Sequence, residues 1–128
     1  MMVTQERLNS GELDVFTAEE TKTMLDRGEA VLIDVRTPAE FAFERIRGAL
    51  LVPMSDVDPA WLPAQAGKRI ILHCASGVRS KHVAELILQA GHGPVAHMDM
   101  GMVGWKRAGL PYVATDPITG APRDVTLG

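Results

Sequence analysis

Residues 70–90 of the chain read IILHCASGVRSKHVAELILQA. The segment begins with the branched apolar run Ile70–Leu72, which is typical of a buried strand. Small residues follow Cys74, and a helical pattern runs from Ser80 to Ala90, with apolar residues on a shared face (Val83, Leu86, Ile87 and Ala90) and Gly91 as its stop. A strand, a tight loop and a helix form the unit from which open α/β sheets are built, and ligands bind at such a loop.

The rest of the chain repeats this alternation of strands and helices. Three further apolar runs, Val31–Val35, Ala49–Val52 and Val95–Met98, predict strands covered on both faces. Helices are predicted at Thr17–Arg27 and Thr37–Phe43, since each opens with a Thr followed three residues later by Glu. The fold class is therefore α/β, with a mostly parallel sheet and helices on both faces. Trp61, in a Pro-punctuated loop, is expected to fill the core.

Composition excludes several classes of protein. The chain has 128 residues, a net charge of −3 (13 Lys+Arg against 16 Asp+Glu) and a single cysteine, so we expect one domain without an internal disulfide or a cysteine-rich zinc site. The four histidines lack metal-ligand spacing, and no metal is expected. The mild negative charge and the lack of basic runs argue against nucleic acid as a partner, and no apolar stretch could span a membrane. A cytoplasmic, reducing location is the expectation.

Cys74 stands at the end of a predicted strand and just before a helix. Backbone N–H groups of such a loop, together with Arg79, favour a thiolate over a thiol. Gly77 can adopt a positive φ that lets the loop curl around the sulfur. A buried, inert cysteine is the alternative interpretation, but these neighbours favour a reactive thiolate. His73 and His97, within apolar runs, are interpreted as structural residues rather than bases.

Three motifs then resemble the rhodanese family of sulfurtransferases, in order along most of the chain. The first is LIDVRTPAEF at residues 32–41, continued by IRGA at 46–49 and VP at 52–53; the second is the loop HCASGVRS at 73–80, and the third is GMVGWKRAGLP at 101–111. The resemblance implies a three-layer rhodanese-like fold with a central, mostly parallel, five-stranded sheet. It also implies a rhodanese-like domain at 16–113, between an N-terminal extension (1–15) and a turn-rich C-terminal tail (114–128).

The resemblance further implies site roles. Cys74 would be the nucleophile that carries a persulfide, taking sulfur from thiosulfate or another persulfide donor and passing it to cyanide or a thiol. The loop residues that would bind the donor are Ala75, Ser76, Gly77, Val78 and Arg79. The residues that would support this loop are Asp34, Arg36 and Ser80. No cofactor is implied. The expected partners are a small sulfur-donor anion or persulfide, an external acceptor and a sulfur-accepting protein.

Two other functions remain open at this point. One is a persulfide carrier or docking module without turnover. The other is a cysteine-dependent phosphatase or arsenate reductase, which the loop length disfavours: those enzymes have five residues between Cys and Arg, whereas four separate Cys74 from Arg79. The sequence also departs from the family pattern. Met100 replaces a usual glycine, and Ala75 replaces a longer polar side chain, which predicts weak use of thiosulfate or preference for another donor.

Overall fold

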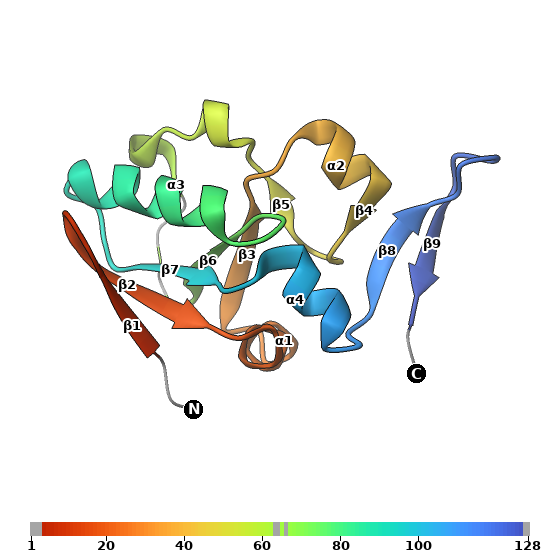
Figure 1. Ribbon diagram of the computed structural model, residues 1–128, viewed down its shortest axis with the longest axis horizontal. Coiled ribbons are helices and arrows are strands. Elements are labelled where there is room, and N and C mark those ends of the chain that lie inside the picture. Colours follow the sequence, from red (N-terminus) through yellow and green to blue (C-terminus); the bar gives the residue numbers. More distant parts are fainter. Residues whose placement is uncertain (1–3, 63–64, 66, 127–128) are drawn as a thin grey trace.

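The centre of the molecule is a six-stranded sheet with the order β1-β2-β7-β6-β3-β5 (Figure 1). In this computed structural model, residues 4–62, 65 and 67–126 are described. Strands β2, β7, β6, β3 and β5 run parallel, and only β1 is antiparallel to its neighbour β2. The strands are β1 (Thr4–Leu8), β2 (Gly11–Phe16), β3 (Ala30–Asp34), β5 (Leu50–Leu51), β6 (Arg69–His73) and β7 (Val95–Met98).

The expected α/β class is confirmed, but the expected number of five strands in the sheet is wrong. The sixth strand is β1, which folds back on β2 through a tight turn at Asn9 and Ser10. It lies within the residues assigned to an N-terminal extension. Thr4–Leu8 is largely exposed at the sheet edge, so its sequence lacks the apolar run that marks the central strands.

Helices cover both faces of the sheet (Figure 1). Helix α3 (Val78–Gln89) packs on one face, and α1 (Ala18–Asp26) and α4 (Gly101–Arg107) pack on the other. Successive strand residues point to opposite faces, so in β6 Ile70 and Leu72 join the α3 core while Ile71 joins the core beneath α1 and α4. This alternation explains why the strands read as continuous apolar runs.

The predicted helix starts are confirmed at α1 and at α2 (Pro38–Phe43), where Thr17 and Thr37 each form a capping box. Helix α3 begins two residues earlier than expected. Its buried face is Ser80, Val83, Ala84 and Ile87, so the expected positions Leu86 and Ala90 are exposed instead. The Trp61 prediction is wrong as well: its side chain is 86% exposed, because the short 3₁₀ helix η2 (Pro59–Trp61), which follows η1 (Met54–Asp56), lies on the surface.

A second, three-stranded antiparallel sheet packs beside α2 and α4. It has the order β4-β8-β9 and consists of β4 (Glu44–Arg45), β8 (Tyr112–Thr115) and β9 (Pro122–Val125). Within the residues assigned to a turn-rich tail, Pro122–Val125 form β9, which pairs with β8, and Val125 packs against the core. Within the described residues, no helix is long and apolar enough to cross a membrane.

Candidate active site

The loop that follows β6 lies at the carboxyl edge of the parallel sheet. Strand β6 ends at His73, and α3 begins at Val78, so Cys74 to Gly77 form the whole connection. Gly77 has φ 105°, a left-handed conformation that side chains rarely adopt, and it directly precedes the helix. This turn is what folds the backbone back over Cys74.

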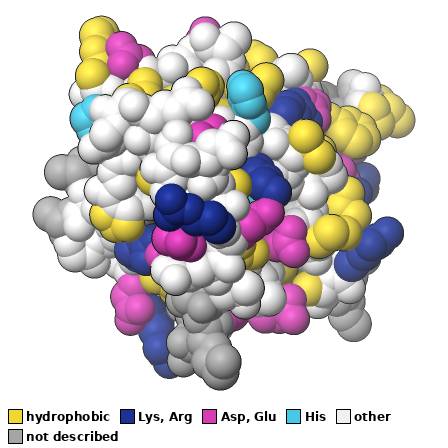
Figure 2. Space-filling model, turned by 60° about the vertical axis from the view of Figure 1, so that its left-hand side comes forward, with side chains coloured by type: hydrophobic (Ala, Val, Ile, Leu, Met, Phe, Trp, Pro, Cys, Tyr) yellow, Lys and Arg dark blue, Asp and Glu magenta, His cyan; other side chains and the backbone are white. Residues whose placement is uncertain are grey.

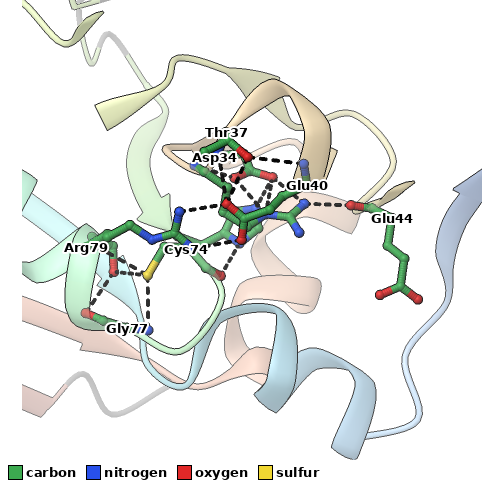
Figure 3. Close-up of polar contacts among 10 residues, drawn as sticks. Asp34, Thr37, Glu40, Glu44, Cys74, Gly77 and Arg79 are labelled. Atoms are coloured by element: carbon green, nitrogen blue, oxygen red, sulfur yellow. Dashed lines mark hydrogen bonds and ion pairs between the residues drawn. The ribbon is translucent and has the colours of Figure 1, made fainter. Parts of the chain in front are cut away.

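Hydrogen-bond donors converge on the Cys74 sulfur, which is buried (Figure 3). The backbone N–H of Gly77 donates to Sγ at 3.1 Å, and the backbone N–H of Ser80 donates to it at 3.4 Å. The Ser80 hydroxyl lies 3.6 Å from the same sulfur. Fixed donors around one sulfur favour its anionic form, because they stabilise negative charge without having to reorganise.

Two opposing effects act on the pKa of Cys74. Burial raises the pKa, since it disfavours a charged sulfur. The N–H and hydroxyl groups of Ser80, followed by the N–H groups of Ser76 and Gly77, outweigh burial, and the pKa of the Cys74 thiol is lowered from its ordinary value. The local geometry therefore favours a reactive thiolate over an inert packed cysteine.

The Arg79 side chain extends toward Glu40 of helix α2 (Figure 3). Its guanidinium donates to both carboxylate oxygens of Glu40, at 2.7 and 2.8 Å. The Arg79 hydrogen bonds lower the pKa of Glu40 to about 2, and the Glu40 carboxylate in turn raises the pKa of Arg79. Arg79 thus ties α3 to α2, while its charge still acts on Cys74 through space.

A buried ionic cluster lies behind the loop, at the ends of β3 and β6. The Asp34 carboxylate accepts hydrogen bonds from the backbone N–H of Arg36 and from its guanidinium, the latter at 2.8–3.0 Å, and Arg36 Nη2 also donates to the Glu44 carbonyl at 2.6 Å. His73 Nδ1 lies 3.2 Å from the Cys74 carbonyl oxygen, and its Nε2 lies 3.3 Å from Asp34. Burial raises the pKa of Asp34, but interactions with His73 and Arg36 outweigh it and hold that pKa below its usual range.

The N-terminus of α4 closes the loop from the opposite side. The N–H of Met102 donates to the Cys74 carbonyl at 2.9 Å, and the N–H of Val103 donates to the Ala75 carbonyl at 3.0 Å. A Cβ on Gly101 would lie 2.2 Å from the Cys74 carbonyl oxygen, so only glycine allows this approach. Met100, at the position of a usual family glycine, adopts φ 63°.

The structure brings some of the candidate residues to the sulfur and leaves others at a distance. Gly77 and Ser80 contact the sulfur, whereas Asp34 and Arg36 reach it only through His73 and the loop backbone. The side chains of Ser76 and Val78 are exposed. Sequence reasoning missed the contact that His97 makes with Ser80, at 2.8 Å, because it depends on how β7 sits beside the loop.

Comparisons with known proteins agree with this arrangement. The family model described as Rhodanese-like domain matches residues 17–108. An uncharacterized protein, slr1261, of Synechocystis sp. is 38% identical over 108 residues, which are 84% of this chain and 60% of that protein, so the chain spans less than two thirds of that relative. A protein named "Sulfurtransferase" from Allochromatium vinosum is 32% identical over 96 residues, covering 75% of this chain and 90% of the relative.

A solved structure shows the same fold. The crystal structure of a rhodanese-related protein from Thermoplasma volcanium superposes with a TM-score of 0.66 at 25% identity, covering 77% of this chain and 96% of the other. The three-layer arrangement expected from the sequence is therefore shared with a solved relative.

Proposed function

This chain belongs to the rhodanese-like domain family, and from that premise we propose that it transfers sulfane sulfur through a persulfide on Cys74. The observation that carries the proposal is the set of hydrogen-bonding groups around one buried sulfur: the N–H groups of Gly77 and Ser80 donate to it, and the Ser80 hydroxyl lies 3.6 Å away. Such a cradle suits a thiolate nucleophile and the sulfur anion that a persulfide presents.

The proposed reaction has two steps. In the first, the Cys74 thiolate attacks the outer sulfur of a donor such as thiosulfate; a bond forms between the two sulfurs, the S–S bond of the donor breaks, and its electron pair leaves with sulfite. In the second, cyanide or a thiolate attacks the outer sulfur of the persulfide, and Cys74 leaves as a thiolate. The chain contains no second cysteine, so the acceptor is external.

The loop residues divide the work in this proposal. The backbone of Ala75 to Arg79 holds the transferred sulfur, and Arg79 supplies positive potential while braced by Glu40. Asp34 and Arg36 hold the carboxyl end of β3 against the loop. Ala75 carries no polar side chain toward a dianionic donor, and weak use of thiosulfate relative to other persulfide donors follows from that. The reducing cytoplasm is the proposed location, because it keeps a lone thiol free.

Phosphate ester hydrolysis is a poorer fit to this geometry. A phosphoryl group needs donors around three equatorial oxygens. The Arg79 guanidinium, which would serve them, is engaged with both oxygens of Glu40, and the loop has one residue fewer than a phosphatase loop. A persulfide carrier without turnover would form the same persulfide on Cys74. It would differ from a sulfurtransferase only in the rate at which the persulfide passes its sulfur to an acceptor.

The proposal is tested by weighing the protein after exposure to donors. Wild type and Cys74→Ala are incubated with thiosulfate or a low-molecular-weight persulfide, freed of excess donor and analysed by mass spectrometry. We expect wild type to gain the mass of one sulfur atom, which cyanide or a thiol then removes, and Cys74→Ala to gain nothing. No gain with any sulfane donor would overturn the proposal, and a gain that no acceptor discharges at a useful rate would indicate the carrier.

A further inference from the structure

A buried histidine stands behind the residue that contacts the sulfur. His97 lies in β7, and its Nδ1 is 2.8 Å from the Ser80 hydroxyl oxygen. The same hydroxyl lies 3.6 Å from Cys74 Sγ and 3.2 Å from the Gly77 carbonyl oxygen. Sulfur, hydroxyl and imidazole therefore form an unbroken series of hydrogen-bonding groups.

The Ser80 hydroxyl has a single proton, so it cannot donate to all of these neighbours at once. When Cys74 is a thiol and His97 Nδ1 is unprotonated, the thiol can donate to the Ser80 oxygen and the Ser80 hydroxyl to Nδ1. When Nδ1 carries a proton, it donates to the Ser80 oxygen, and the hydroxyl is free to donate to a thiolate. The protonation of His97 thus decides whether Ser80 acts as acceptor or donor toward the sulfur.

We propose that Ser80 and His97 form a proton relay that activates Cys74. The S–H bond breaks as its proton passes to the Ser80 oxygen, while the Ser80 hydroxyl proton passes to His97 Nδ1. The products are a thiolate that accepts a hydrogen bond from Ser80 and an imidazolium that donates to Ser80. In the reverse direction, the relay returns a proton when Cys74 leaves the persulfide. Ser80 is the catalytic residue here, and His97 is a positioning residue that acts through it. The inference rests on the proposed role of Cys74 as the nucleophile.

The surroundings of His97 suit an acceptor that starts neutral. Its side chain is only 3% exposed, and burial lowers the pKa of His97, with Asp99 and Glu6 opposing that effect and Lys81 adding to it. Glu6 comes from β1 and Lys81 from α3, while Asp99 directly follows β7, and Lys81 pairs with Glu6. Lys81 is the only cation among these three groups, and its pairing with Glu6 leaves no unpaired positive charge from them beside the His97 ring.

His97 also reaches a surface pocket through which a proton can leave. The pocket has a volume of about 550 Å³ and is lined by β1, the loop residues Ser76 and Gly77, and His97. Figure 2 brings forward the side of the molecule on which β1, β2 and α3 lie, and basic side chains there stand next to acidic ones instead of forming one charged patch. The relay thus connects the buried sulfur with water in this pocket, one wall of which is formed by β1.

The test measures how pH controls the reactivity of Cys74, with no sulfur donor present. The rate of alkylation by iodoacetamide is followed from pH 5 to 9 for wild type, Ser80→Ala, His97→Gln, the double variant and His92→Gln, an exposed histidine outside this network. In Ser80→Ala, loss of a charge-assisted hydrogen bond is expected to move the midpoint of the rate–pH profile up by about one pH unit, so that alkylation at a pH below that midpoint is about tenfold slower than in wild type. The midpoint of the profile should also rise in His97→Gln, and it should stay at the wild-type value in His92→Gln.

The double variant and the conservative variant separate a relay from mere packing. If His97 acts through Ser80, adding His97→Gln to Ser80→Ala causes no further shift of the rate–pH profile. Ser80→Thr keeps the hydroxyl and should have the wild-type profile. Additive shifts, or an unchanged profile in either single variant, would overturn the relay. Melting curves show whether each variant is folded.

A measurement on the wild-type chain avoids substitution altogether. The imidazole nitrogens of His97 are followed by NMR against pH before and after alkylation of Cys74, and the relay requires the His97 titration to change when the thiol is blocked. An identical titration would contradict it. Because neither readout uses a sulfur donor, failure of the relay leaves the gain of sulfur mass by Cys74 intact, and failure of that gain leaves these profiles unaffected.

Discussion

Substituting Asp34 by Asn tests whether the buried ionic cluster holds the sheet edge behind the loop. Asn has the shape of Asp and can still accept the Arg36 backbone N–H, so the substitution removes charge with little change in volume. It leaves the Arg36 guanidinium buried beside a neutral amide. Removing one partner of a buried ion pair costs about 3–5 kcal/mol, a large part of a total stability of about 5–15 kcal/mol.

The expected loss is measured by urea and thermal unfolding. For a domain of this size, it corresponds to a fall in Tm of roughly 10–20 °C. The matched control is Asp124→Asn, which removes the carboxylate of the exposed pair Arg47–Asp124, whose side chains are 72% and 68% exposed. Exposed pairs contribute at most about 1 kcal/mol, so this control should unfold close to wild type.

The dependence on pH follows from the lowered pKa of Asp34. A carboxylate whose folded pKa is depressed stabilises the fold above its unfolded pKa and loses that contribution as the pH falls toward the folded pKa. The difference in free energy of unfolding between wild type and Asp34→Asn should therefore be constant from about pH 5 to 8 and become smaller below about pH 4. Replacing Arg36 as well, in Asp34→Asn/Arg36→Met, should recover part of the loss because no unpaired charge remains.

Two results would contradict the role assigned to the Asp34–Arg36 pair. One is a loss below about 1 kcal/mol for Asp34→Asn, equal to that of the exposed control. The other is a double variant less stable than Asp34→Asn alone, which would mean that Arg36 stabilises the fold without its carboxylate partner.

Three further predictions concern the loop and its supports. Glu40→Gln should lose about 1 kcal/mol at pH 6 in urea unfolding, after allowing for solvent screening of a partly exposed pair; because the Glu40 pKa is lowered to about 2, the loss should shrink as the pH falls below the ordinary pKa of Glu, and a loss that grows in acid would contradict the assignment. Gly101→Ala should slow persulfide formation on Cys74 at least about tenfold, since its Cβ would meet the Cys74 carbonyl. Its control is Gly120→Ala, which has a similarly positive φ but open space around the Cβ, and equal rates in the two variants would argue against the clash. Thr37→Ala should cost about 1 kcal/mol in thermal unfolding through loss of the α2 capping box, whereas Thr23→Ala, within α1, should cost little.

The parts of the fold that are marked by local pattern could be predicted. The central strands bury both faces, so they appear as apolar runs, and the two capping boxes place the starts of α1 and α2 within a few residues. Edge elements could not be found in this way. Strands β1 and β9 are largely exposed and gain their hydrogen bonds from neighbouring strands, so their sequences need no apolar periodicity.

In the candidate site, too, some features follow from the local sequence and others depend on contacts between distant residues. The position of Cys74 between a strand and a helix, and the need for a glycine at residue 77, follow from the order of residue types along the chain. The direction of Arg79 toward Glu40, the contact between His97 and Ser80, and the approach of Gly101 to the loop join residues 17 to 39 positions apart.

Local backbone preferences and apolar periodicity act between near neighbours, so the order of residues specifies the strand–loop–helix unit around a single thiol. The groups that surround that thiol and its supports depend on the tertiary fold, because parallel strands bring distant segments to one edge of the sheet. There Ser80 meets both the sulfur and His97, while Asp34 holds Arg36 and His73 together behind the loop.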